Sequence, residues 1–161
     1  FTAPLLTPSP VEYRGVATRD ECDNLKPPTG TRLAAHYYAT GVQIYRWIGS
    51  AWTLVGPRAV LFADSGRTRK AGTHYAGPAW QTTGGSKVVG RAAQRCSPDS
   101  TAIPWLSLDA VSSDSAGDFR RVTFIQRVRT VGGVAPSAAG TSAGEEASVP
   151  YSAEYLFYRT D

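Results

Sequence analysis

The chain has 161 residues and a formal net charge of +4, so it fits one domain that can bury a core without metals or many disulfides. No apolar run approaches the roughly 18 residues needed to cross a bilayer, which excludes a transmembrane segment. Phosphate-loop, dinucleotide and zinc-finger patterns are absent, and no basic run or recognition helix occurs, which argues against nucleotide-dependent chemistry and nucleic-acid partners.

The chain begins at Phe1 and contains no methionine, which predicts a processed product whose signal peptide has been removed. We therefore expect a secreted, extracellular protein. Its positive charge comes mostly from arginine and favours an anionic ligand, such as a cell-wall polymer, an acidic polysaccharide or a membrane surface. A cationic surface that merely keeps the protein soluble explains the charge equally well.

Residues 1–28 are rich in proline and polar residues and have no sustained periodicity. They predict an extended N-terminal arm of coil, followed by a β domain over residues 29–161. The arm contains Cys22, and the only other cysteine is Cys96. Their wide separation does not fit a zinc site or a redox dithiol, so we expect one disulfide; two buried free thiols are the alternative.

Short strand-like runs separated by turn residues begin at Arg32, and no window sustains a helical stripe. This pattern predicts an all-β domain, an antiparallel β-sandwich or β-barrel. Gly49 and Ser50 suit a hairpin turn, and residues 132–148 read as a long flexible loop. The expected strands cover 33–39, 41–47, 52–55, 59–62, 73–75, 87–94, 103–111, 121–130 and 151–159.

The run over residues 121–130 alternates cleanly, as expected of a half-buried strand. Its apolar face would contain Val122, Phe124, Gln126 and Val128. Its other face would contain Thr123, Ile125, Arg127 and Arg129, which predicts a basic outer side. We expect Val122 and Phe124 in the core with Ile44 and Trp105.

The segment over residues 72–80 places His74 and Trp80 among glycines and a proline. Such residues free a segment from regular pairing, so His74 would project beside Tyr75 and Trp80 at a functional loop. His74 is the candidate catalytic base or polar anchor, with a structural histidine or a metal ligand as alternatives. Trp80 is either a stacking platform for a sugar ring or a core residue.

The expected ligand-binding neighbours of His74 are Tyr75, Trp80, Ser86, Lys87, Gln126 and Arg127. Gln126 and Arg127 point to opposite faces of one strand, so both cannot serve one pocket unless a bulge intervenes. The only other histidine, His36, alternates with Tyr38 and suits a satisfied sheet position. We expect no metal and no cofactor, since two histidines cannot form a three-histidine site.

Two weaker signals carry little chemistry. The run 140–144 matches the nucleophile-elbow pattern around Ser142, but it lies in a Gly, Ala and Ser tract rather than between a strand and a helix. Glu145 and Glu146 are adjacent in the expected loop, and no pair of carboxylates suited to glycoside hydrolysis can be selected.

Several motifs together resemble the domain of unknown function 3455 family, secreted proteins of bacteria and fungi. The resemblance spans about Leu25 to Arg159 and rests on residues 39–45, 72–80, 85–90, 103–106, 125–127 with 130–133, and 149–155. It implies export and a β-rich fold but no established reaction. Trp47 stands where many members have cysteine, and a cysteine expected after residues 135–136 is missing, so the resemblance implies a subgroup-specific Cys22–Cys96 bridge.

Two functions of different classes remain open from the sequence. The first is a non-catalytic binding protein that uses aromatic and basic residues to hold an extracellular polysaccharide or cell-wall polymer. The alternative is a small secreted hydrolase or lyase with a pocket centred on His74. An enzyme needs a perturbed pKa and an oriented partner in a concave site, whereas a binding module does not. The oligomeric state is not predicted.

Overall fold

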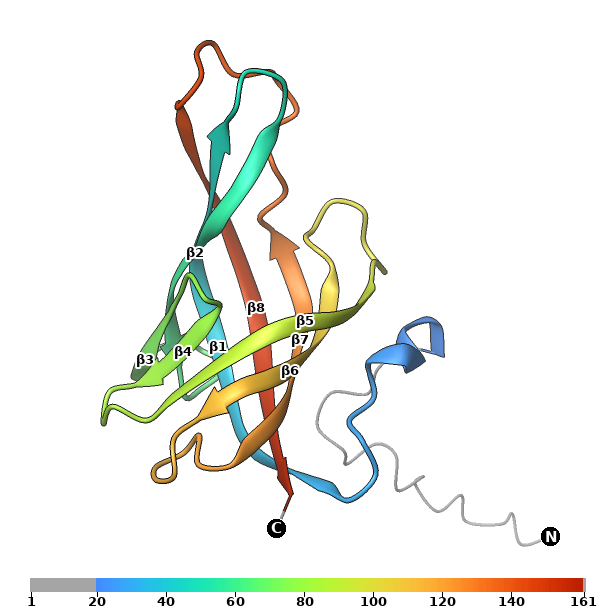
Figure 1. Cartoon of the computed structure of the whole chain (residues 1–161), viewed down its shortest axis with the longest axis vertical. Helices are drawn as coiled ribbons and strands as arrows, with labels where there is room; N and C mark the ends of the chain where they lie inside the picture. The colour runs from blue at the N-terminus through green and yellow to red at the C-terminus, as the bar shows by residue number, and fades with distance from the viewer. Residues whose placement is uncertain (1–19, 161) are drawn as a thin grey trace, which may run out of the picture.

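Eight antiparallel strands close into one barrel, in which each strand pairs with its sequence neighbours and β1 pairs with β8 (Figure 1). The computed structural model describes residues 20–160. The all-β prediction is confirmed, and the barrel, rather than the sandwich, is the architecture. The strands are β1 (Thr31–Trp47), β2 (Trp52–Phe62), β3 (Lys70–Tyr75), β4 (Ala79–Thr82), β5 (Lys87–Cys96), β6 (Trp105–Ser113), β7 (Val122–Gly132) and β8 (Glu146–Thr160).

Two pairs of expected strands are each one long strand. β1 continues through Gly41, where the barrel requires glycine because a Cβ would lie 2.1 Å from the carbonyl oxygen of Arg58 on β2. β2 continues through Gly56 and Pro57, next to a register shift between Ile44 and Tyr45 of β1. A β-bulge at this register shift accommodates Gly56 and Pro57 within the β1–β2 pairing, so these turn-forming residues do not end the strand. Strand β4 was not expected.

The connections alternate between the two ends of the barrel because the strands run up and down in sequence order. We call the end with the β1–β2, β3–β4, β5–β6 and β7–β8 connections the cavity end, and the opposite end the groove end. The predicted hairpin turn is confirmed, with Ile48 donating its N–H to Ala51 and Gly49 at φ 95°. The β7–β8 connection packs against this hairpin, where Trp52 Nε1 donates to the carbonyl of Ala138 at 2.9 Å.

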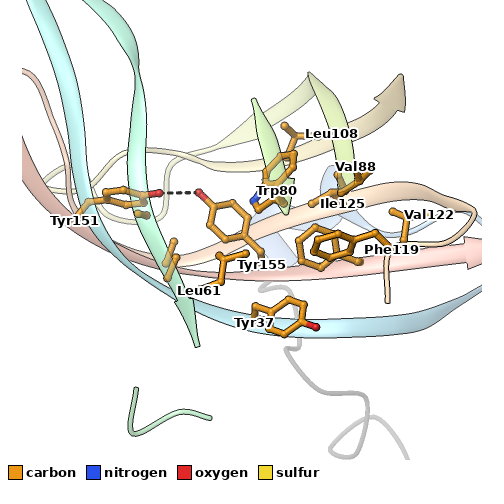
Figure 2. Close-up of a cluster of buried hydrophobic side chains, with 14 of the residues drawn as sticks. Tyr37, Leu61, Trp80, Val88, Leu108, Phe119, Val122, Ile125, Tyr151 and Tyr155 are labelled. Carbon is orange, nitrogen blue, oxygen red and sulfur yellow. Dashed lines mark hydrogen bonds between the residues drawn. The ribbon is translucent and has the colours of Figure 1, made fainter. Parts of the chain in front are cut away.

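The barrel interior is filled mainly by large aromatic and aliphatic side chains (Figure 2). Phe119 and Phe157 pack with their ring centroids 4.5 Å apart, and Trp80 packs edge-to-face on Tyr155. The other large members of this interior cluster are Tyr37, Leu61, Val88, Ile103, Leu108, Val122, Ile125 and Tyr151. Burying aromatic side chains of this size contributes much of the stability of such a core.

A second cluster lies outside the barrel, beneath a 3-10 helix, η2 (Asp20–Leu25), which lies beside β5 (Figure 1). Leu25 of this helix packs with Val128 and Leu156 on the outer face of the sheet. The coil predicted for the arm is therefore wrong over residues 20–25, because the buried Leu25 and a disulfide hold this segment on the barrel. Residues 26–28 of the predicted arm are coil, as expected, and residues 1–19 of it lie outside the described residues, as does Asp161.

The predicted Cys22–Cys96 disulfide is confirmed, with the two Cα atoms 5.5 Å apart. It joins η2 to the last residue of β5. In the part of the chain that the structure describes, no helix is long and apolar enough to span a membrane.

The predicted faces of β7 are wrong. Ile125 and Arg127 point into the barrel, whereas Gln126 and Val128 point outward and are covered by Leu25 of η2. Both faces of this strand are buried over these positions, so alternation alone could not identify the inner face. Register shifts at both ends of β7 change which residues face inward.

Of the four residues expected in the core, three are buried: Val122 inside the barrel, Trp105 in the outer cluster, and Phe124, which packs edge-to-face on Tyr158. Ile44 is only half-buried. It alternates with the inward-pointing Gln43 and Tyr45, which are buried in its place.

Candidate functional site

A cavity of about 320 Å³ opens at the cavity end of the barrel. This volume falls within the range of small-molecule sites in proteins. His74 and Trp80 are at its wall together with Arg127 and Tyr155. The remaining wall is mainly apolar and consists of Leu54, Val55, Gly56, Pro57, Ala76, Gly77, Pro78, Ala92, Leu106 and Leu108, with Gln43 as a further polar member.

His74 and Trp80 are opposite each other on paired strands, β3 and β4. Their rings stack with centroids 4.5 Å apart and an angle of 11° between planes. The tilted ring of Tyr155 lies 4.9 Å from His74 on another side. The predicted neighbourhood of His74 and Trp80 is thus real, but it is a strand pair facing the interior rather than an exposed loop, and Trp80 is only 1% exposed.

The hydrogen bond of His74 determines its tautomer. Its Nδ1 lies 2.8 Å from the carbonyl oxygen of Ala79, which can only accept, so Nδ1 carries the proton. Burial lowers the pKa of His74 to about 3, and the positive charge of Arg127 also lowers it. The ring is therefore neutral at physiological pH, with a lone pair on Nε2.

This buried histidine predicts a pH-dependent stability. The folded pKa of about 3 lies below the ordinary value of 6.5, so the unfolded chain binds the proton more readily. The free energy of unfolding is therefore not reduced by His74 above about pH 6.5. Between pH 6.5 and about 3 the titration of His74 lowers it by up to about 1.4 kcal/mol per pH unit. Urea unfolding between pH 7 and pH 4 measures this slope.

The matched control is His74→Gln, whose amide can still donate to Ala79 but does not titrate. We expect the stability of this variant to fall less steeply below pH 6.5. Other groups, such as Glu154, whose pKa is also lowered, change the stability of both proteins with pH. The difference between parent and variant therefore isolates the contribution of His74 to the pH dependence. Parallel loss of stability in the parent and the variant would contradict the assignment.

Two buried polar atoms of cavity-wall residues have no hydrogen-bond partner among residues 20–160: Oε1 of Gln43 and Nε1 of Trp80. Their side chains are 3% and 1% exposed. An unpaired buried polar atom typically costs about 1 to 3 kcal/mol. Figure 2 shows the indole nitrogen of Trp80 on the side of the ring nearer Tyr155. A donor and an acceptor thus remain unsatisfied on two residues of the same cavity wall.

Of the cavity-wall residues that the structure describes, Arg127 alone carries a formal charge, since His74 is neutral. Its Nε and Nη2 donate to the carbonyl oxygen of Pro104 at 3.0 and 2.8 Å, which fixes the guanidinium plane. Among residues 20–160, no carboxylate forms an ion pair with it. The cavity therefore has an uncompensated positive charge.

Two phenols lie at the polar side of the site, with Tyr155 in the cavity wall and Tyr151 next to Tyr155. The hydroxyls of Tyr151 and Tyr155 are 3.2 Å apart (Figure 2). Burial raises the pKa of both phenols, so both are protonated at neutral pH. The site offers donors and neutral acceptors but no negative charge.

Tyr75 and Lys87 do not reach the cavity. Tyr75 alternates with the inward-pointing His74 and lies on the outer surface, where its hydroxyl donates to Gln81 at 2.9 Å. The Lys87 ammonium lies 5.6 Å from the centre of the Tyr75 ring. The two residues meet each other outside the barrel and are separated from Trp80 by the sheet.

Ser86 and Gln126 make structural hydrogen bonds elsewhere. Ser86 Oγ donates to the carbonyl of Ala116 and accepts from the N–H of Phe119, which fixes the β6–β7 connection at the groove end. Gln126 Nε2 donates to the carbonyl of Leu25 at 2.6 Å, which ties the arm to β7. The structure therefore brings together His74, Trp80 and Arg127 of the predicted site.

Gln43 and the pair Tyr151 and Tyr155 were not among the site residues predicted from the sequence. They lie on β1 and β8, far in sequence from β3 and β4. A partial signal existed, because Gln43 alternates with Tyr45 in β1, and Tyr151 and Tyr155 share one face of β8. Only closure of the barrel between β1 and β8 places these residues opposite His74.

The weaker motifs occupy other places. His36 pairs with Glu154 at 3.1 Å on the outer face, and Glu145 accepts hydrogen bonds from Thr141 within the β7–β8 connection. Ser142 is exposed in that same connection. Among the described residues, no three His, Cys, Asp or Glu side chains come together in a group that could hold a metal.

A second, open depression of about 710 Å³ lies at the groove end. We call it the polar groove. Small and hydroxyl-bearing residues line it, with Asp114 and Asp118 as its carboxylates and Lys70 as its cation. Asp118 accepts from Tyr37 at 2.8 Å, and Asp114 accepts the N–H of Lys87.

The fold and the cavity define a small closed barrel with an internal, partly polar site. Residues 27–159 match the family described as protein of unknown function DUF3455, and the chain belongs to this family. No curated protein and no solved structure matches the chain.

Proposed function

We propose that this chain is a secreted, non-catalytic binding protein that holds a small ligand inside the cavity end of its barrel. The observation that carries the proposal is the pair of unpartnered buried atoms on Gln43 and Trp80, two residues of the cavity wall to which Arg127 also belongs. A ligand that hydrogen bonds with these groups would recover their desolvation cost. Eight-stranded barrels have an interior of the right size for one small ligand.

The same geometry supports binding over catalysis. A general base works best with a pKa near the operating pH, whereas the pKa of His74 is lowered to about 3. Its Nδ1 is bound to a backbone carbonyl rather than to an orienting carboxylate. The hydrolase or lyase alternative would need His74 to act as a base from this unfavourable state.

Secretion is part of this proposal. The Cys22–Cys96 disulfide is the supporting observation, because disulfides persist mainly in oxidising compartments outside the cytosol.

A polysaccharide or cell-wall polymer is a second candidate ligand, and the polar groove supports it better than the cavity does. The cavity is too small to admit a polymer chain, whereas the groove is open and has about twice its volume. The hydroxyl and carboxylate groups of Thr82, Thr83 and Asp114 are of the kind that hydrogen bond with sugar hydroxyls. A glycan and peptidoglycan array tests this candidate.

Blocking the cavity tests the main proposal. Leu106 on β6 lies opposite Arg127 in the wall and is half-buried, so Leu106→Trp would fill the space in front of the guanidinium. A thermal-shift screen of small acids, amines, neutral aromatics and sugars should find ligands that raise the Tm of the parent. At a free concentration one hundred times its Kd, such a ligand raises the free energy of unfolding by about 2.7 kcal/mol.

The matched control is Val111→Trp, which adds the same bulk to an exposed position of the same strand. We expect Leu106→Trp to abolish the ligand-induced rise in Tm and Val111→Trp to retain it. A ligand that stabilises both variants equally would bind elsewhere and would contradict the cavity as the site.

A further inference from the structure

We propose that the cavity selects an apolar-bodied organic molecule that carries one carboxylate and one further hydrogen-bond donor. This inference rests on the proposed function, since it names the ligand class of the same cavity. Three independent features of the wall support it: its charge, its unpaired donor and acceptor, and its apolar lining.

The charge of the wall favours a monoanion. Among the described wall residues, Arg127 carries the one formal charge, while His74 and Tyr155 are neutral at physiological pH. A carboxylate of the ligand would compensate this charge, which no acidic side chain of residues 20–160 does. Arginine is the side chain best suited to a carboxylate, because its N–H groups form a planar fork.

The unpaired atoms assign further ligand groups. Nε1 of Trp80 can only donate, so it requires an acceptor on the ligand, such as a carboxylate oxygen. Oε1 of Gln43 requires a donor, such as a hydroxyl or an N–H. A second anionic group would find no second cation among the described residues of the wall, which favours a ligand with one negative charge.

The rest of the wall is apolar and excludes a strongly hydrated body. Leu54, Leu106 and Leu108 contribute aliphatic surface, and Pro57 and Pro78 add to it. Sugar hydroxyls placed there would lose their water without gaining partners. A cavity of about 320 Å³ admits one substituted aromatic ring, since a cavity of roughly 150 Å³ binds benzene.

Hydroxylated aromatic acids provide direct probes. In isothermal titration calorimetry at pH 7, we expect 4-hydroxybenzoate or 4-hydroxyphenylacetate to bind the parent protein. Their methyl esters, which are neutral but nearly the same shape, should bind about 10- to 100-fold more weakly, the range expected for a lost charge-assisted hydrogen bond. This comparison needs no variant, so it holds even if substitutions impair folding.

Two variants identify the groups that make the contacts. Arg127→Gln should weaken the acid about 10- to 100-fold and leave the ester unchanged, while Arg58→Gln, at an exposed position of β2, should change neither. Gln43→Leu removes the unpaired acceptor. It should reduce the difference between 4-hydroxybenzoate and benzoate, and raise the Tm of the free protein, because a buried unpaired group is replaced by an apolar one.

The outcomes separate this inference from the proposed function. If esters, amides or glucuronate bind in the cavity as tightly as the phenolic acids, a ligand site exists but the acidic, apolar ligand class is wrong. Failure of every aromatic acid to bind overturns the inference. Failure of every compound in the thermal-shift screen overturns the proposed function as well.

Discussion

Replacing both cysteines, as in Cys22→Ser with Cys96→Ser, should lower the free energy of unfolding by about 4 kcal/mol in the chain-entropy model of a loop of this length. The two residues are 74 positions apart, so the bridge restricts much of the unfolded chain. It also holds η2 over the outer cluster, where Leu25 and Trp105 are buried. Urea unfolding at pH 7 measures the loss, and Trp105 fluorescence should shift to the red as the arm detaches.

A packing variant separates the crosslink from the contacts that it holds in place. Leu25→Ala keeps the disulfide but removes a fully buried side chain, and should cost about 2 to 5 kcal/mol. If the double cysteine variant unfolds at the same urea concentration as the parent, the crosslink contributes nothing to the stability of the barrel. That result would contradict the stabilising role of the disulfide, and an unchanged midpoint in Leu25→Ala would contradict the stabilising role of η2.

Trp80→Ala should lower the free energy of unfolding by about 3 to 5 kcal/mol, because it removes a large buried side chain from the barrel interior. The indole stacks on His74 and packs edge-to-face on Tyr155 and Phe157, so its loss leaves a void among three rings. Trp80→Phe keeps most of the apolar surface and deletes the unpaired Nε1, so its cost should be much smaller. Urea unfolding of the two variants measures the difference.

The matched control for Trp80 is Trp52→Ala. Trp52 lies in the β1–β2 hairpin, is only half-buried, and donates to the carbonyl of Ala138. We expect a smaller loss of stability than for Trp80→Ala. A loss below about 1 kcal/mol in Trp80→Ala would mean that the interior collapses around the void, and would contradict the rigid wall on which the cavity depends.

These predictions also bear on function, since Trp80 is both a core residue and part of the cavity wall. Its two roles, structural packing and stacking platform, were alternatives in the sequence, and the structure places the indole too deep to act as an exposed platform. The part of Trp80 that remains available for binding is its unpaired N–H. Trp80→Phe therefore tests binding with little loss of folding.

Local patterns in the sequence were sufficient to predict four features: the all-β class, most strands, the hairpin at Gly49 and the Cys22–Cys96 bridge. Each of these depends on short-range signals, namely alternation, turn residues and the presence of two cysteines. The proximity of His74 and Trp80 was also predictable, because they are six positions apart across a tight turn. Their inward orientation was not, since the glycines and the proline indicated an exposed loop.

The tertiary structure alone decided which face of each strand lines the barrel. Arg127 was expected on a solvent-facing side, yet it faces inward, because η2 buries the opposite face of β7 and bulges shift its register. Closure of β1 on β8 then brings Gln43 and Tyr155 to the same cavity. Alternation with a period of two identifies two faces but not which of them is inside, and when both are buried only long-range packing makes that choice.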